Sequence, residues 1–151
     1  MADKVRWGIL GCGKIAHKFA SDLSFTGNGV LTAVASRQAE NAKEFASQHG
    51  ASYFFASYDE LVCNNEVDVI YVATPHGFHH EHVMLCLRNK KAVLCEKAFA
   101  LNLTQASEMI ALAKQERVFL MEAFWTKFLP QYNKVMELIA TNVIGEVKWL
   151  Q

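Results

Sequence analysis

Short apolar runs alternate along the chain with stretches whose apolar residues recur at helical spacing. Most of the runs are continuously apolar, as expected of strands that are covered by helices on both faces. The candidate strands are Val5–Leu10, Val30–Ala35, Ser52–Phe55, Val67–Ala73, Ala92–Cys95 and Val118–Met121. Alternation of such strands with helices is typical of βαβ units around a parallel sheet. The pattern therefore predicts an α/β fold with a doubly wound sheet.

Amphipathic stretches between these strands predict the helices that cover the sheet. Counting from Ala42, from Ala106 and from Tyr132, mainly apolar residues fall at positions i, i+3, i+4 and i+7, which is one face of a helix. We expect each face to pack against the core. The segment Ser57-Tyr58-Asp59-Glu60 has the form of a capping box and predicts a further short helix.

The periodic pattern changes near the C-terminus. Residues 1–143 contain no repeat, low-complexity tract or Pro/Gly-rich linker, and we expect them to form one Rossmann-type domain. A turn at Gly145 then leads into a new alternating segment. We expect residues 144–151 to be the first strand of a second α+β domain with an open sheet, whose remainder lies beyond this sequence.

Composition narrows the classes of partner. The 151 residues carry 15 Lys plus Arg against 15 Asp plus Glu, so no global positive field attracts nucleic acid or an anionic membrane. No apolar run approaches the roughly 20 residues that span a bilayer. The four cysteines lack CxxC spacing, which favours reduced, buried thiols and a cytoplasmic protein.

A GxGxxA segment directly follows the first predicted strand and opens a helix. Gly11 allows a tight turn, Gly13 lets the backbone approach a pyrophosphate, and Ala16 allows close packing of helix on strand. The helix N-terminus adds free N–H groups and a positive dipole end at Lys14 and Ile15. Flavoproteins, methyltransferases and plain tight turns also carry such glycines, so the neighbouring residues are needed to identify the ligand that this motif indicates.

The end of the second predicted strand indicates which dinucleotide is bound. A domain specific for NAD usually places Asp or Glu there to grip the ribose hydroxyls, whereas this chain has Ser36 and Arg37. A hydroxyl and a guanidinium suit a 2′-phosphate, which predicts NADP(H). The alternative is that Ser36 caps the helix that starts near Gln38 and Arg37 is a solvated charge.

Further polar residues stand where other predicted strands end. Glu96 and Lys97 follow a buried strand, Thr74-Pro75-His76 follows another, and Glu122 to Trp125 follows the last. Because ligands of open α/β sheets bind outside the carboxyl ends of strands, these residues are expected to face one crevice together with Gly11 and Gly13. The alternative for Glu96 and Lys97 is an exposed salt-bridged pair in a loop.

These motifs, in this order and spacing, resemble the Gfo/Idh/MocA oxidoreductases over essentially the whole chain. The resemblance rests on Gly11–Ala16, Ser36-Arg37, Thr74-Pro75 with His79, Glu96-Lys97 and residues 121–130. The last two segments look like the branch of NADP-dependent dimeric dihydrodiol dehydrogenases, relatives of which also oxidise D-xylose. The resemblance implies hydride transfer from a CH–OH group of a sugar or cyclic trans-diol to NADP+ and a homodimer or higher oligomer.

The resemblance also implies roles for single residues. Lys97 is the implied catalytic residue beside the substrate hydroxyl, and Glu96 helps to hold the nicotinamide ribose. Further cofactor contacts are implied at Thr74, Pro75, His76, His79 and Trp125. The family's second domain supplies another proton-transfer residue and most contacts to the substrate.

Three departures from the family pattern concern the substrate side. Ala98 stands where the family has proline after the lysine, His76 replaces a frequent asparagine, and Lys127 replaces an arginine of close relatives. Ala98 leaves its loop less rigid, and Lys127 cannot make a bidentate arginine contact.

The histidines between positions 76 and 82 raise the question of a metal site. His76 and His80 are one helical turn apart, but further ligands and supporting contacts are not evident, so we expect no metal. We expect these rings to lie near an anionic cofactor instead, with His79 packed under the crevice.

For the mechanism, we expect Lys97 to assist removal of the hydroxyl proton, which requires its pKa to fall through burial or a neighbouring positive charge. Two other functions are compatible with the same pattern. One is a non-catalytic NADP(H)-binding regulator, and the other is an interaction domain whose glycine turn is empty.

Overall fold

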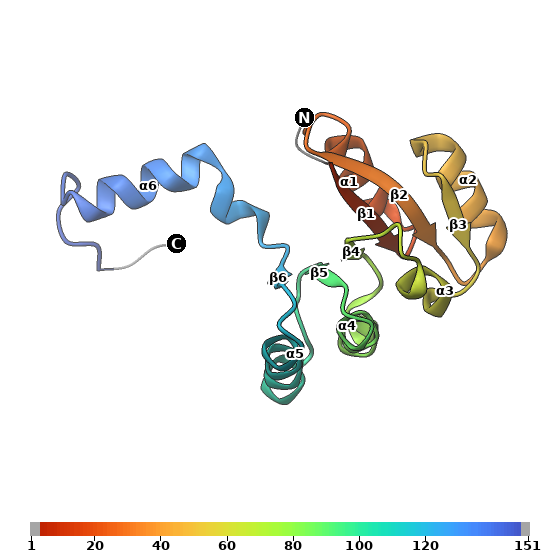
Figure 1. Cartoon of the computed structure of the whole chain (residues 1–151). Helices are drawn as coiled ribbons and strands as arrows, with labels where there is room; N and C mark the ends of the chain where they lie inside the picture. Colours follow the sequence, from red (N-terminus) through yellow and green to blue (C-terminus); the bar gives the residue numbers. More distant parts are fainter. Residues whose placement is uncertain (1–3, 149–151) are drawn as a thin grey trace.

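The computed structural model describes residues 4–148 as a six-stranded parallel sheet with helices on both faces (Figure 1). The strands are β1 (Val5–Leu10), β2 (Gly29–Ala35), β3 (Tyr53–Phe55), β4 (Val69–Val72), β5 (Ala92–Cys95) and β6 (Leu120–Glu122). Their order across the sheet is β3-β2-β1-β4-β5-β6. The chain therefore adds β2 and β3 on one side of β1 and then adds β4, β5 and β6 on the other side. This is the doubly wound Rossmann order, and it confirms the predicted fold class.

The structure contains the three helices that the amphipathic pattern predicts, the helices predicted after the glycine motif and the Ser57 capping box, a further helix α4, and two short 3-10 turns. They are α1 (Lys14–Leu23), α2 (Ala39–His49), α3 (Tyr58–Cys63), η1 (His76–Phe78), α4 (His79–Arg88), α5 (Leu103–Glu116), η2 (Trp125–Phe128) and α6 (Pro130–Ala140). Ser57 caps α3 by accepting a hydrogen bond of 3.1 Å from the Asp59 N–H. Asn102 caps α5 in the same way from the Gln105 N–H.

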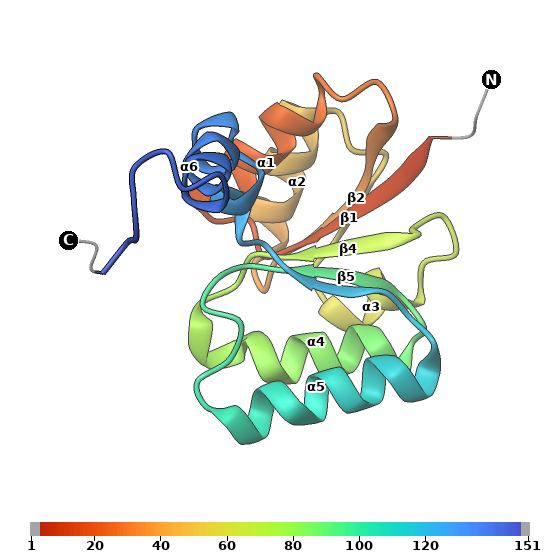
Figure 2. The same ribbon diagram turned by 90° about the vertical axis from the view of Figure 1, so that its left-hand side faces the viewer.

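Two hydrophobic cores lie on the two faces of the sheet, and successive strand residues alternate between them. Ile9 and Tyr71 point into the core beneath α1 and α2, whereas Leu10, Ile70 and Val72 point into the core beneath α3, α4 and α5. Figure 2 shows α4 and α5 together on one side of the strands and α1 and α2 on the other. Burial on both faces explains why the strands are continuously apolar.

Some details differ from the sequence predictions. β4 is shorter than predicted, and β6 begins two residues later and ends one residue later, at Glu122. In α5, Met109 and Ala113 are buried but Ile110 is 44% exposed. Cys86 and Cys95 are buried thiols as expected, whereas Cys63 at the end of α3 is exposed.

The prediction that α6 packs against the core is wrong for this structure. Helix α6 has no buried residue, and the predicted core face is open, with Val135 48% and Met136 46% exposed. Figure 1 shows why, because the chain leaves the sheet at the edge strand β6 and α6 extends away from it. Helical periodicity identifies an apolar face but not the surface that covers it.

The predicted second-domain strand, residues 144–151, is only partly visible. Residues 145–148 have no regular secondary structure, and 149–151 lie outside the described residues. The division at residue 143 therefore stays a prediction. Among the helices of residues 4–148, none has both the length and the apolar content that crossing a membrane requires.

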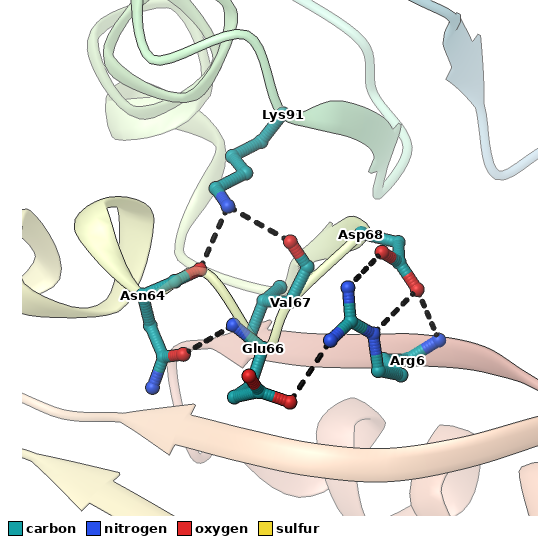
Figure 3. Close-up of polar contacts among 6 residues, drawn as sticks. All are labelled: Arg6, Asn64, Glu66, Val67, Asp68 and Lys91. Carbon is teal, nitrogen blue, oxygen red and sulfur yellow. Dashed lines mark hydrogen bonds and ion pairs between the residues drawn. The ribbon is translucent and has the colours of Figure 1, made fainter.

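A polar cluster ties together the starts of β1, β4 and β5 at the amino edge of the sheet (Figure 3). The Arg6 guanidinium donates to Asp68 and Glu66, with its Nη2 2.6 Å from Asp68 Oδ1. Lys91 Nζ donates to the carbonyl oxygens of Asn64 at 2.7 Å and Val67 at 2.8 Å. We expect the ligand at the carboxyl ends of the strands. The polar cluster lies at the opposite edge of the sheet.

Candidate functional site

The turn after β1 requires glycine at position 11. Gly11 has φ of +99°, a region that residues with a side chain rarely adopt. A Cβ atom there would lie 2.9 Å from Cγ2 of Thr74 and 3.2 Å from the carbonyl of Ala73. The loop after β1 therefore passes directly against the end of β4, as the glycine motif predicts.

The N-terminus of α1 is open for a ligand. Gly13 is the N-cap residue, and no side chain within residues 4–148 caps this helix. The nearest atom to a Cβ built on Gly13 is the Ala73 carbonyl oxygen at 4.0 Å, so the missing side chain leaves free space above the backbone. Ala16 is fully buried against the sheet, as predicted. The N–H groups of the first turn, at Lys14 and Ile15, can therefore receive an anion.

The end of β2 presents a guanidinium. Arg37 is exposed, and its Cζ atom lies 5.9 Å from the centre of the Phe78 ring. Ser36 Oγ accepts a long hydrogen bond of 3.4 Å from the Gln38 N–H, but this bond does not make Ser36 the cap of α2. The N-cap residue of α2 is Gln38 itself.

Two histidines connect the end of β4 to its surroundings. His79 is fully buried, and its ring nitrogens lie 2.8 Å from the carbonyl oxygens of Thr74 and Ala98, which joins the loop after β4 to the loop after β5. His82 Nδ1 lies 2.9 Å from Thr74 Oγ1. Burial lowers the pKa of His82, so that its ring is neutral at pH 7.

The end of β5 holds a buried carboxylate and an exposed ammonium group. Glu96 is 7% exposed, with Oε1 accepting a hydrogen bond of 2.5 Å from the Tyr71 hydroxyl and Oε2 accepting one of 3.1 Å from the Lys97 N–H. Burial, together with Glu96, raises the pKa of Tyr71. The Lys97 side chain is exposed. Glu96 and Lys97 are therefore not the exposed ion pair of the alternative interpretation.

Six of the predicted site residues line two cavities, three in each. The larger, of about 410 Å³, includes Ile15, Glu96 and Trp125 in an otherwise mostly apolar lining. The smaller, of about 250 Å³, includes Arg37 together with Thr74 and Pro75. The Gly11–Ile15 turn follows β1, which lies between β2 and β4 in the sheet. The carboxyl edge therefore offers separate spaces for two halves of an extended ligand.

The histidines near η1 have separate contacts. His80 Nε2 lies 2.7 Å from Glu108 Oε2, while His76 is exposed with its ring 5.5 Å from that of His79. In the described part of the chain, no three His, Cys, Asp or Glu side chains gather in a way that could hold a metal ion.

Sequence reasoning missed three aromatic residues of this edge. Tyr71 lies in an apolar strand, where its hydroxyl signals a need for a buried partner. Phe78 and Tyr58 line the smaller cavity beside Arg37. For these two residues the sequence carries no signal, because their proximity arises from the order of the strands.

Comparison with known proteins agrees with this geometry. A family model described as an oxidoreductase family with an NAD-binding Rossmann fold, Gfo/Idh/MocA, matches residues 5–124. The chain belongs to this family. The resemblance drawn from the sequence motifs is thereby confirmed.

Within the Gfo/Idh/MocA family, several relatives are similar along nearly all of this chain. Trans-1,2-dihydrobenzene-1,2-diol dehydrogenase of Xenopus tropicalis is 41% identical over 97% of this chain and 45% of its own length. The D-xylose 1-dehydrogenase (NADP(+)) of Hypocrea jecorina is 38% identical over 95% of this chain and 40% of its own. A crystal structure of a 3-ketoreductase from Actinomadura kijaniata with NADP has a TM-score of 0.91 at 32% identity and covers 97% of this chain and 47% of that one. The chain thus spans less than half the length of these relatives.

Proposed function

We propose that this chain is the cofactor-binding part of an NADP-dependent oxidoreductase. The observation that carries the proposal is the uncapped N-terminus of α1 behind Gly11 and Gly13, at the carboxyl edge of a doubly wound sheet. Such an N-terminus receives a pyrophosphate. The named activities of the relatives support the same class, since one is a dehydrogenase using NADP(+) and another is a reductase solved with NADP.

Arg37 supports NADP(H) over NAD(H). It stands at the end of β2, and among residues 4–148 no carboxylate forms an ion pair with it. A guanidinium with free N–H donors suits a 2′-phosphate, and an acidic residue, which would repel that phosphate, does not occupy this strand end. Ser36 adds a hydroxyl beside it.

The remaining predicted residues fit the other half of the cofactor. Ile15, Glu96 and Trp125 line the larger cavity, which suits the nicotinamide ribose and ring. Thr74 and Pro75 line the smaller cavity at the end of β4, and His76 is exposed next to them, whereas the buried His79 supports this loop through the carbonyl oxygens of Thr74 and Ala98. NADP+ held there would supply the hydride acceptor for a CH–OH carbon, and Lys97 would assist removal of the hydroxyl proton, which leaves a carbonyl group. Glu96, fixed by Tyr71 and by the Lys97 N–H, holds the ribose.

The substrate and assembly complete the proposal. By analogy with the relatives, the whole protein acts on a sugar such as D-xylose or on a cyclic trans-diol, and it works in the cytoplasm as a homodimer or higher oligomer. Lys97 is exposed in residues 4–148, so the substrate must be enclosed by further protein surface before its proton can be transferred efficiently.

A titration with NADPH and NADH tests the cofactor proposal. The chain is expected to bind NADPH more tightly, and Arg37→Ala is expected to narrow the difference by about tenfold to a hundredfold, because a charge-assisted contact contributes roughly 1.5–3 kcal/mol. Cofactor fluorescence measures both dissociation constants. Lys43→Met, which removes an exposed charge on α2, is the control and should leave the ratio unchanged. Equal affinities in the unchanged chain would contradict the proposal.

A further inference from the structure

The side chain that faces Arg37 is an exposed aromatic ring. Phe78 is 41% exposed at the end of η1, and the Arg37 Cζ atom lies 5.9 Å from its ring centre. A guanidinium at this distance is attracted to the face of the ring. The two residues follow β2 and β4, which flank β1 in the sheet.

The ring of Phe78 is held in place by the buried groups around it. It stacks on His82, with ring centres 5.7 Å apart and planes at 19°. His82 is in turn fixed by Thr74 Oγ1 at 2.9 Å and by the edge of the Tyr58 ring, whose centre is 4.8 Å away. Phe78 is therefore a positioned surface for Arg37 rather than a freely rotating side chain.

The position of Arg37 over the Phe78 ring leaves its N–H donors available. A cation–π attraction acts on the charge of the guanidinium, whose Cζ atom lies over the ring, and does not require any of its N–H groups as a hydrogen-bond donor. Arg37 also has no carboxylate partner among the described side chains. Its donors can therefore turn toward an anion in the cavity of about 250 Å³ that both residues line.

An acidic residue that could compete for Arg37 lines the same cavity. Glu81 lines the cavity with Arg37 and Phe78 but is not ion-paired with Arg37. An arginine without the aromatic contact would be free to pair with this carboxylate, which would use the donors that a phosphate needs. Glu81 would also repel an incoming phosphate unless Arg37 offsets its charge.

We propose that Phe78 is a specificity-determining residue that holds the Arg37 guanidinium in place for the 2′-phosphate of NADP(H). The inference rests on the proposed cofactor function and deepens it. Phe78 acts through Arg37, so it is a positioning residue for a phosphate-bearing ligand. Its removal should weaken binding of the cofactor with the 2′-phosphate and leave the cofactor without it unaffected.

Binding of NADPH and NADH to matched variants of this chain tests the inference. Phe78→Leu removes the aromatic face but keeps an apolar side chain, and it should weaken NADPH binding by about two- to fivefold with NADH affinity unchanged. Phe78→Tyr keeps the ring and should retain the NADPH affinity. Phe119→Leu, which changes an exposed phenylalanine next to β6, should have no effect.

A double variant separates positioning of Arg37 from a general effect on folding. In the Arg37→Ala background, Phe78→Leu should cause no further loss of NADPH affinity, because the residue it positions is gone. Three results would overturn the inference: unchanged NADPH affinity in Phe78→Leu, equal losses for both cofactors, or an undiminished effect without Arg37. If the unchanged chain bound neither NADPH nor NADH, that result would instead overturn the proposed function, and this inference with it.

Discussion

Tyr71 illustrates how one hydroxyl on a buried strand contributes to the site. Its ring stacks on Phe19 with centres 4.0 Å apart, while its hydroxyl reaches the carboxylate of Glu96. The tyrosine therefore packs in the core and donates to a charged group at the carboxyl edge. Glu96 tolerates its burial because both carboxylate oxygens accept a hydrogen bond.

Removing the Tyr71 hydroxyl should reduce stability. Tyr71→Phe leaves Glu96 Oε1 without its donor in a buried position, and the expected loss is about 1–3 kcal/mol in the free energy of unfolding. Urea denaturation followed by circular dichroism measures it. Tyr53→Phe is the control, since Tyr53 is 42% exposed on β3. Equal stability changes in the two variants would contradict the structural role of the buried hydrogen bond.

His82 should make the stability of the chain depend on pH. Burial lowers its pKa in the folded state below the unfolded value of about 6.5. At acidic pH the unfolded chain therefore binds more protons than the folded chain. The neutral His82 costs no stability above about pH 6.5, and the free energy of unfolding decreases as the pH falls below that value. Unfolding free energies at several pH values between 7.5 and 5.5 should fall less steeply for His82→Gln than for the unchanged chain. Because the pKa of His49 is also lowered, only the difference between the two chains reports on His82.

At the scale of elements, the two ends of the parallel strands differ in structure. The carboxyl edge carries open turns, such as the one at Gly11, and the amino edge is held by side-chain contacts between strand starts. Lys91, which is half-buried just before β5, reaches two carbonyl oxygens of the segment that leads into β4. Such contacts hold the starts of β4 and β5, which pair in parallel from Val69↔Ala92 to Val72↔Cys95, so that the segments after both strands leave the sheet at the same far edge.

Loss of the Lys91 contacts should therefore destabilise the chain. Lys91→Met keeps most of the aliphatic stem but leaves the carbonyls of Asn64 and Val67 without this donor, at an expected cost of about 1–3 kcal/mol. The midpoint of urea unfolding provides the measurement. Lys43→Met, an exposed change on α2, should alter the free energy of unfolding by less than about 0.5 kcal/mol and leave the midpoint nearly unchanged. If both variants unfold at the same urea concentration, the amino-edge cluster does not stabilise the fold.

At the scale of the molecule, the described residues contain more of the proposed cofactor site than of the proposed reaction site. The predicted cofactor contacts surround Gly11 and the two cavities, whereas Lys97 is exposed and α6 presents an open apolar face. The chain also spans less than half the length of its relatives. We infer that catalysis requires surface beyond that of residues 4–148.

Replacing Lys97 in a complete enzyme that contains this chain should reduce turnover without reducing cofactor binding. Lys97→Met is expected to reduce turnover by about 10²- to 10⁴-fold, the usual contribution of a general acid or base. NADPH binding at Gly11–Ile15 should persist. Steady-state rates with D-xylose or a cyclic trans-diol, together with NADPH titration, provide the readouts. Near-normal turnover would show that Lys97 is not the catalytic group, and a complete protein that binds NADPH without any turnover would be a regulator instead.

Much of the fold could be predicted because its determinants are local. The bounds of β1 and β5 match the apolar runs, and the turn at Gly11 has a positive φ, a backbone conformation that few residues other than glycine adopt. The family also follows from the sequence, since its motifs lie at strand ends whose order along the chain is visible. These features depend on periodicity and on the conformational preferences of single residues.

Tertiary structure alone decided which side chains meet. The contact of Tyr71 with Glu96 joins residues 25 positions apart, and that of Arg37 with Phe78 joins the ends of two strands separated by β1. Whether the apolar face of α6 is covered was likewise decided by its position beyond the edge strand. Local patterns determine whether a segment forms a helix or a strand and which of its faces is apolar. The surroundings of a side chain depend on how all the elements pack together, because long-range contacts follow from strand order and register.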